Sequence, residues 1–470
     1  MFYKKTFYVF AALLSVAITA DGQSGYSKDR VYTANQVSNS VSVIDPASNR
    51  LLGEIPLGNP YPNVLSPLYR GQSLVHGLRY APQKKMLAVV SIGSNAVTLI
   101  STQTNQVIQT IYVGRSPHEP TFTPDGKQVW VSVRGEAYIS VIDVDKRAEI
   151  KRIAVADGPG MVSFSPDGAT AYVCSSFTPE LDVVNTSTFE VVKRIPVTSP
   201  FSPNIFTSPD GAWVAMTHKD VGKVTVIDAR KLSVYKVINT GAITNHVTFT
   251  TTNNKTLMLV TVGGENKVRI FDVNRDFLQT DSITVGTLPH GLWASRDGKL
   301  LYVGLEYADQ VQAIDLEHMH ASHPVKIGQS PQALVYADNA VEDKGDTAGL
   351  SPLQNAVQTQ TIVMKGVSSN GLGRIAVRPI GLTDLVEQIF GGLTPAHAYV
   401  LALTHSKEPP FTIDVVLNSF TTDPAGKYMG QSTGLVKTTN AQADVQPFTW
   451  LLLQDKATGK VVLQSNVTQP

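Results

Sequence analysis

The sequence predicts an all-β protein, with a seven-bladed β-propeller followed by a small β-sandwich-like domain. The first observation is a repeated strand end, in which an apolar residue is followed by Asp, Asn or Ser. It occurs at Ile44-Asp45, Ile100-Ser101, Ile142-Asp143, Val184-Asn185, Ile227-Asp228, Phe271-Asp272 and Ile314-Asp315. The copies are 42 to 44 residues apart, except for a first step of 56 residues. A four-stranded propeller blade spans about 40 to 50 residues, so seven copies predict seven blades.

The second observation is a tight turn that recurs between two strands of a repeat. It reads Ser-Pro-Asp-Gly at 165–168 and 208–211, Thr-Pro-Asp-Gly at 123–126 and Ser-Arg-Asp-Gly at 295–298. Asp initiates such a turn, and Gly adopts the positive φ that the turn requires. The segments that follow the turns, such as Val129–Val133, are rich in β-branched residues, which is typical of strands.

These repeats resemble the YVTN-type propeller repeat, in which an S-P-D-G turn leads to a V-Y-V-type strand and then to S-V-x-V-I-D. The local matches are Val31-Tyr-Thr-Ala34, Ala171-Tyr-Val-Cys174, Leu301-Tyr-Val-Gly304, Ser42-Val-Ile-Asp45 and Val224-Thr-Val-Ile-Asp228. The resemblance covers about residues 31 to 340. It implies a YVTN-repeat seven-bladed propeller, of the kind found among bacterial exported, lactonase-like proteins.

The register of the repeats predicts how the ring closes. The chain enters at Val31, in the second strand of a blade, and leaves with Gln332 to Tyr336 as a lone first strand. We therefore expect a propeller over residues 31–337 in which the last strand completes the first blade and removes free sheet edges. The Asn59 to Ser73 insertion is interpreted either as a binding loop or as a tolerated surface insertion.

Beyond the repeats, a polar stretch at 338–359 is interpreted as a linker, and 360–470 as a C-terminal β-sandwich-like domain of no recognised family. The spacing of Leu382, Leu385, Val386 and Ile389 predicts a helix over Leu382–Phe390. Short alternating segments predict strands at Thr361–Met364, Gly373–Arg378, Ala398–Leu403, Thr412–Leu417, Thr449–Leu453 and Val461–Gln464.

The N-terminus has the pattern of a secretory signal peptide over residues 1–22. Lys4 and Lys5 precede an apolar run from Phe7 to Thr19, and small residues suited to cleavage follow at Ala20-Asp21-Gly22. We therefore expect bacterial export to the periplasm or to the exterior. An uncleaved N-terminal anchor is the alternative interpretation.

Composition and charge exclude several classes of partner. The formal net charge is +1 and no long basic or acidic run occurs, so neither nucleic acid nor an anionic membrane surface is expected. No second apolar run is long enough to span a membrane after signal removal. We expect an envelope or extracellular protein, a glycan or a small ligand as partner. The single cysteine, Cys174, lies in an alternating strand pattern that predicts a core position.

Four of the ten histidines occupy the same position of the repeat. This position opens the first, innermost strand of a blade, so the side chains are expected to surround one mouth of the central channel. They are His76, His118, His246 and His290. Loops on the same face are expected to add Arg134, His218, Lys219 and Glu306, and Glu119 and Asn245 flank two of the histidines. Together these residues predict a polar funnel that carries both signs of charge.

Three functions fit such a funnel. No nucleotide loop, nucleophile elbow, H-E-x-x-H or Cys-based zinc pattern occurs, so the first is a non-catalytic scaffold that binds a protein, glycan or small ligand. The second is an enzyme of the propeller-lactonase or lyase type, with a ring histidine as acid or base and Arg134 or Lys219 holding a carboxylate. The third is a copper or other metal site formed by His76, His118, His246 and His290.

The histidines also have a purely structural interpretation, because an imidazole at the start of a strand can fix a turn by hydrogen bonding to the neighbouring blade. The residues alone leave binding, catalysis and architecture open. Apart from the metal ion of the third function, the sequence predicts no cofactor.

Overall fold

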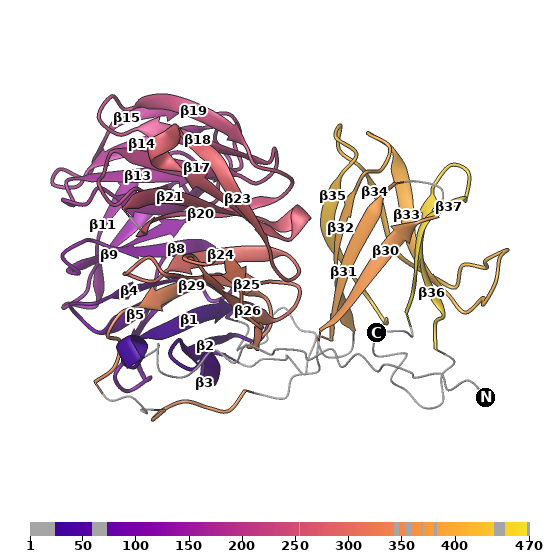
Figure 1. The fold of residues 1–470 in the computed structure, drawn as a ribbon, viewed down its shortest axis with the longest axis horizontal. Coiled ribbons are helices and arrows are strands. Elements are labelled where there is room, and N and C mark those ends of the chain that lie inside the picture. Colours follow the sequence, from indigo (N-terminus) through magenta and orange to yellow (C-terminus); the bar gives the residue numbers. More distant parts are fainter. Residues whose placement is uncertain are drawn as a thin grey trace, which may run out of the picture.

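The computed structural model describes residues 24–467, apart from 59–72, 253, 343–346, 354–358, 368–369, 380–382 and 437–446. The expected signal peptide, and all of the Asn59–Ser73 insertion except Ser73, lie outside the described residues. Figure 1 shows two β domains, a large propeller and a smaller second domain. The described residues include three short 3-10 turns, at Ser24–Tyr26 (η2), Gly263–Glu265 (η3) and Val273–Arg275 (η4). They contain no helix that is long and apolar enough to cross a membrane.

The first blade combines strands from both ends of the propeller. Val31 pairs with Tyr336 across this junction, which confirms that the last strand closes the ring. The strand order is β29-β1-β2-β3. The bounds are Arg30–Asn35 for β1, Ser40–Asp45 for β2, Arg50–Pro56 for β3 and Pro331–Ala337 for β29.

The second, third and fourth blades are four-stranded antiparallel sheets in chain order, with the first strand innermost. The second blade contains β4 (Val75–Ala81), β5 (Met86–Ser91), β6 (Ala96–Ser101) and β7 (Val107–Tyr112). The third contains β8 (Pro117–Phe122), β9 (Gln128–Val133), β10 (Tyr138–Asp143) and β11 (Ala148–Ala154). The fourth contains β12 (Pro159–Phe164), β13 (Thr170–Ser175), β14 (Glu180–Asn185) and β15 (Glu190–Pro196).

The remaining three blades follow the same plan, and the outer strand of the seventh is split in two. The fifth blade contains β16 (Ile205–Thr207), β17 (Trp213–His218), β18 (Lys223–Asp228) and β19 (Ser233–Asn239). The sixth contains β20 (Thr244–Thr252), β21 (Lys255–Val262), β22 (Lys267–Asp272) and β23 (Leu278–Thr284). The seventh contains β24 (Pro289–Ala294), β25 (Leu300–Leu305), β26 (Gln310–Asp315), β27 (His320–Ala321) and β28 (Val325–Lys326).

Burial decreases from the centre of the ring outwards. Every residue of the inner strands β12 and β29 is buried, whereas the outer strand β23 exposes all but one of its residues. Apolar side chains fill the space between blades, and Trp130 packs edge-on against Phe164 of the next blade with ring centroids 5.1 Å apart. Cys174 is fully buried as predicted, and burial raises the pKa of its thiol to about 12, which leaves it unreactive.

The predicted turns have the chemistry that their sequence implies. In the fourth blade, Asp167 Oδ1 accepts hydrogen bonds from Ser165 Oγ at 2.5 Å and from the Ala169 backbone N–H at 3.0 Å. Gly168 has a φ of 72°, a conformation that residues with a Cβ rarely adopt. These turns hold the first two strands of a blade in register.

The described part of the 338–359 segment lies against the propeller. Asn105 Nδ2 donates a hydrogen bond to the Ala348 carbonyl at 2.9 Å, and Glu54 N–H donates to the Ser351 carbonyl at 2.8 Å. Ala340 is fully buried among residues of the first two blades. The chain is therefore anchored to the propeller before it enters the second domain.

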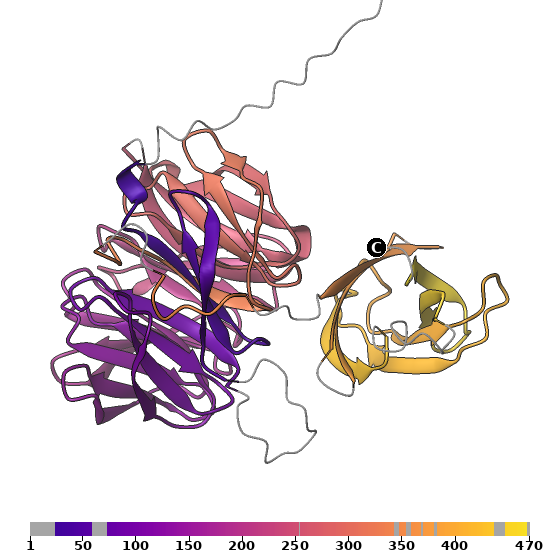
Figure 2. The ribbon, with the colours of Figure 1, turned by 90° about the horizontal axis from the view of Figure 1, so that it is seen from below.

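The second domain is one nearly closed, eight-stranded sheet, in the order β34-β33-β36-β37-β30-β31-β32-β35 (Figure 2). Its curvature encloses an apolar core in which the rings of Phe420 and Tyr428 stack with centroids 3.8 Å apart. The strands are β30 (Gln360–Gly366), β31 (Leu372–Pro379), β32 (Asp384–Gly391), β33 (Ala398–Thr404), β34 (Val415–Thr421), β35 (Tyr428–Gly434), β36 (Trp450–Asp455) and β37 (Val461–Asn466).

The helix predicted over Leu382–Phe390 is wrong, because the segment from Asp384 to Phe390 belongs to β32. Asp384, Val386 and Gln388 are buried while Leu385 and Glu387 are only partly buried, which is an alternation with the period of a strand. β32 also lies between β31 and β35 and hydrogen-bonds to both. The strand predicted at Thr412–Leu417 begins and ends later, at Val415–Thr421.

Candidate ligand-binding site at the channel mouth

The four histidines predicted at the channel mouth, called the histidine ring below, lie together in two pairs. His76 at the start of β4 and His118 at the start of β8 have ring centroids 4.4 Å apart. His246 on β20 and His290 on β24 form the second pair, with centroids 4.8 Å apart. Each of the four residues is at most 7% exposed. The repeat position thus predicted their convergence, although not their pairing.

Two of the ring histidines hydrogen-bond to the next blade. His118 Nδ1 lies 2.7 Å from the Gly160 carbonyl oxygen, and His290 Nδ1 lies 2.5 Å from that of Gln332. A carbonyl oxygen only accepts, so Nδ1 carries the proton and donates. The lone pair of each ring is therefore on Nε2. These bonds confirm the structural role, and they also orient a basic nitrogen that a ligand or a metal can use.

Burial keeps the histidine ring uncharged at neutral pH. Removal from water, assisted by neighbouring cationic groups, lowers the pKa of His76 to about 3 and that of His290 to about 3. The same cause lowers the pKa values of His118 and His246 well below the usual range. Acid–base catalysis at neutral pH needs a pKa near that pH, so the ring is better suited to accepting hydrogen bonds or coordinating a metal.

A buried ion pair lies beside the first histidine pair. Arg79 Nη1 is 3.3 Å from Glu119 Oε2, and the guanidinium lies 4.9 Å from the ring centroid of Trp293. Burial raises the pKa of Glu119 to about 7, and Arg79 opposes that shift. A Cβ on Gly77 would approach the His118 backbone carbonyl oxygen to 2.5 Å, so glycine allows the close approach of these two inner strands. Arg79 was not among the site residues predicted from the sequence. The signal that could have identified it is its position as an arginine on a predicted innermost strand.

Two further cations at the mouth form no ion pair within the described parts of the chain. The Arg134 guanidinium lies 5.6 Å from the ring centroids of both Phe177 and Phe201. Burial lowers the pKa of Lys219. The charge of Glu306 raises this pKa, and the charge of Arg134 lowers it further. Lys219 is partly buried, and its charge also lowers the pKa of His290. Neither cation therefore has a carboxylate within ion-pair distance among the described residues.

Glu306 supplies the negative charge predicted at this mouth. Its Oε2 is 4.0 Å from His290 Nε2, and the residue is 9% exposed. It lies directly after β25, on the loop that leads to β26. The funnel thus has both signs of charge, as expected from the sequence.

Two predicted mouth residues instead hold the strands together. His218 is fully buried, with Nδ1 2.7 Å from Ser202 Oγ and Nε2 2.6 Å from Thr225 Oγ1, so both nitrogens are occupied. Asn245 Nδ2 donates to the Pro289 carbonyl of the next blade at 2.8 Å. The structure therefore does not place His218 or Asn245 where a ligand could reach their side chains.

The second domain packs on the propeller face that carries the mouth. Leu288 and Tyr307 of the propeller form an apolar cluster with Ala376 and Ile389 of the second domain. Arg378 of β31 is fully buried and donates from Nη2 to the Glu306 carbonyl at 2.6 Å. Figures 1 and 2 both show the second domain against one side of the propeller. Both domains were predicted from the sequence, but the contact between them was not.

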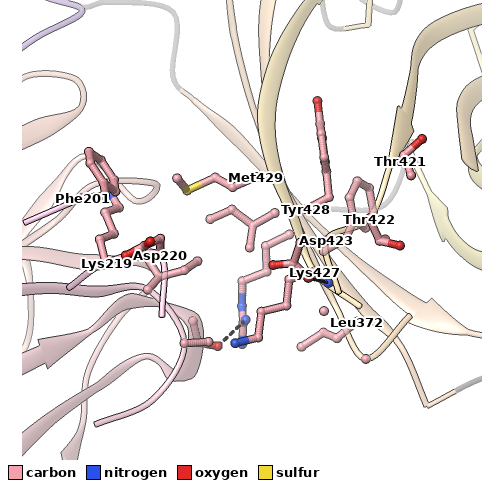
Figure 3. Close-up of a pocket in the computed structure, with 18 of the residues that line it drawn as sticks. Phe201, Lys219, Asp220, Leu372, Thr421, Thr422, Asp423, Lys427, Tyr428 and Met429 are labelled. Atoms are coloured by element: carbon pink, nitrogen blue, oxygen red, sulfur yellow. Dashed lines mark hydrogen bonds between the residues drawn. The ribbon is translucent and has the colours of Figure 1, made fainter. Parts of the chain in front are cut away.

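A cleft of about 590 Å³ lies where the two domains meet. Figure 3 shows Phe201, Lys219 and Asp220 on the propeller side, opposite Leu372 and Met429 of the second domain. Leu372 is 36% exposed and Met429 is 49% exposed, so the cleft presents apolar surface to solvent. Its volume is in the range that holds small molecules, about 300 to 1,000 Å³.

Comparison with known families identifies the class of the propeller. The family model of the YNCE-like β-propeller matches residues 15–342, which is more than half of the chain. The protein therefore belongs to the YNCE-like β-propeller family, in agreement with the seven blades and the repeat resemblance. Among curated proteins, no match was found.

Similar solved structures support the fold alone. A chain of the hydrazine synthase of Kuenenia stuttgartiensis is 21% identical, with a TM-score of 0.51 over 58% of this chain and 93% of that one. A functionally unknown protein from Desulfotomaculum acetoxidans DSM 771 is 11% identical, with a TM-score of 0.54 over 66% of this chain and 99% of that one. At these identities the likeness carries no activity across to this protein.

Proposed function

We propose that the protein is an exported, non-catalytic binding protein that holds a small organic anion in the cleft between the channel mouth and the second domain. The observation that carries this proposal is the position of Lys219. Its side chain lines the cleft, has no ion-pair partner among the described residues, and acts electrostatically on the histidine ring. A partly buried cation with no carboxylate in ion-pair contact is stabilised by an anionic ligand.

The other walls of the cleft indicate the rest of the ligand. Leu372, Met429, Ile389 and Phe201 line the cleft and offer apolar contacts. Burying such surface favours a ligand with an apolar body at about 25 cal/mol per Å². The ligand that fits is therefore amphipathic, with a carboxylate, sulfonate or phosphate directed at Lys219 and an aromatic or aliphatic body against the second domain.

The low pKa values of the ring favour binding over catalysis. A ring histidine with a pKa of about 3 accepts a proton too weakly to act as an efficient general base at neutral pH. We therefore place the lactonase or lyase activity second to ligand binding.

The first experiment uses anilinonaphthalene sulfonate, an anion with an aromatic body, as the probe. Fluorescence titration should give one saturable site, and Lys219→Gln should weaken binding about tenfold because one charge-assisted contact of about 1.5 kcal/mol is lost. Lys193→Gln is the matched control, since Lys193 is an exposed lysine outside the cleft. Equal affinity of the Lys219→Gln variant and the wild type would contradict the proposal.

Export is tested separately. When the full chain is expressed in a Gram-negative bacterium, the mature protein should be found in the periplasm or the medium and should begin at Gln23. N-terminal sequencing and cell fractionation measure this directly. A cytoplasmic protein that retains residues 1–22 would contradict the localisation and leave the binding proposal to the titration.

A further inference from the structure

A compact group of side chains that could hold a metal ion lies at the channel mouth, and none of them lines the cleft. His76, His118 and Glu119 each offer one ligand atom, and these three atoms lie within 4.8 Å of one another. The residues are 7%, 4% and 1% exposed, respectively. They come from β4 and β8, two adjacent inner strands, so the propeller holds their backbones in place.

Three polar atoms of this group lack a hydrogen-bond partner among the residues that the structure describes. His76 Nδ1 and both carboxylate oxygens of Glu119 are buried without a hydrogen bond. Leaving such groups unsatisfied costs about 1 to 3 kcal/mol each, and more for a charged group. Arg79 lies 3.3 Å from Oε2 of the carboxylate, while Oε1 is directed towards His76 Nδ1 at 4.0 Å. A cation placed among the three side chains would satisfy the atoms that Arg79 does not.

We propose that His76, His118 and Glu119 bind one divalent transition-metal ion, with Zn²⁺ the ion that the donor set fits. Two imidazoles and one carboxylate are typical of zinc sites and disfavour Mg²⁺ and Ca²⁺, which prefer oxygen ligands. The hydrogen bond from His118 Nδ1 to the Gly160 carbonyl leaves Nε2 as the ligand atom and fixes the ring, as is common for metal-bound histidines.

The three-residue group differs from a site formed by all four ring histidines. His246 and His290 form their own pair and join no group of three or more ligand atoms among the described residues. Three protein ligands leave a coordination position for water or an exogenous ligand. None of the three ligands lines the cleft, so the metal proposal does not rest on the anion proposal, and either can fail without the other.

The test is isothermal titration of chelator-treated, tag-free full-length protein with zinc chloride. We expect one equivalent of Zn²⁺ to bind to the wild type. His118→Ala and His76→Ala should each weaken binding at least about 100-fold, because a ligand is lost. Cobalt(II) as a substitute ion should show visible d–d bands in the wild type and not in these variants.

Two controls distinguish this site from other histidines. His246→Ala removes a buried ring histidine outside the group, and His320→Ala removes an exposed histidine on β27. Both should retain one equivalent of Zn²⁺ at wild-type affinity. Circular dichroism and the melting temperature establish that each variant is folded. The proposal is overturned if folded wild type takes up no stoichiometric metal, or if uptake depends on His246 or His320 and not on His76 and His118.

Discussion

The two domains place their buried polar residues differently. The propeller buries charged and imidazole groups at the centre of its ring, where Arg79 and Glu119 are 6% and 1% exposed. The second domain fills its interior with an apolar cluster, and its His397 and His405 are only partly buried and pair with Asp455 and Asp414. Burying unpaired polar groups lowers stability, and three such atoms belong to His76 and Glu119, where we propose that a metal binds. The second domain covers part of the propeller face that carries the channel mouth and supplies the apolar wall of the cleft.

The largest expected effect is on the packing between blades. Trp130 is fully buried and packs against Phe164 of the next blade, so Trp130→Ala should lower the free energy of unfolding of the propeller by about 3 to 5 kcal/mol. Phe390→Ala should cause a similar loss in the second domain, where its ring stacks on Phe420 at 5.2 Å. Calorimetry should resolve which transition moves. A shift of both transitions by either variant would show that the domains unfold as one unit.

A smaller effect is expected at the contact between the domains. Arg378 is fully buried, and its Nη2 donates to the Glu306 backbone carbonyl at 2.6 Å and lies 3.4 Å from Asp309 Oδ1 of the propeller. Arg378→Ala should destabilise the docked arrangement by about 3 kcal/mol, because the Asp309 carboxylate loses its counter-charge and the Glu306 carbonyl loses its donor. Limited proteolysis should then cleave the 338–359 segment faster. Lys365→Ala, at an exposed position of β30, is the control and should leave the rate unchanged.

Acid should destabilise the propeller first. Its buried histidines have lowered pKa values, so the unfolded chain binds protons that the folded chain does not as the pH falls below 6.5. The contribution of these histidines to the free energy of unfolding is therefore fully present above pH 6.5. It decreases as the pH falls towards the pKa in the folded state, which is about 4 for His218. By contrast, Asp455 of the second domain has a pKa lowered to about 2 by its hydrogen bond to His397, so its contribution is lost only below about pH 3.8.

Thermal unfolding of the metal-free protein from pH 7 to pH 4 measures this difference. The melting temperature of the propeller should decrease more steeply than that of the second domain. His218→Gln should flatten the propeller's slope, whereas His320→Gln, at an exposed position, should not. Equal slopes for the two domains would refute the assignment of the acid sensitivity to the buried histidines.

Periodic features of the chain were predictable, and contacts between distant parts were not. The seven blades, the closing strand and the meeting of His76, His118, His246 and His290 all follow from one repeated register. The segment at Leu382–Phe390 was misread because its apolar residues fit a helical spacing as well as the alternation that β31 and β35 impose. Arg79 and Arg378 were missed because their partners, Glu119 and Glu306, lie in other blades or in the other domain. The cleft exists only once the domains are docked, so no local pattern indicates it.

The most direct test of the proposed function is a crystal structure of the protein with anilinonaphthalene sulfonate bound. We expect the sulfonate within ion-pair distance of the Lys219 ammonium, and the rings against Leu372 and Met429 of the second domain. Density for the probe at another surface, with the cleft beside Lys219 empty at saturating probe, would contradict the account.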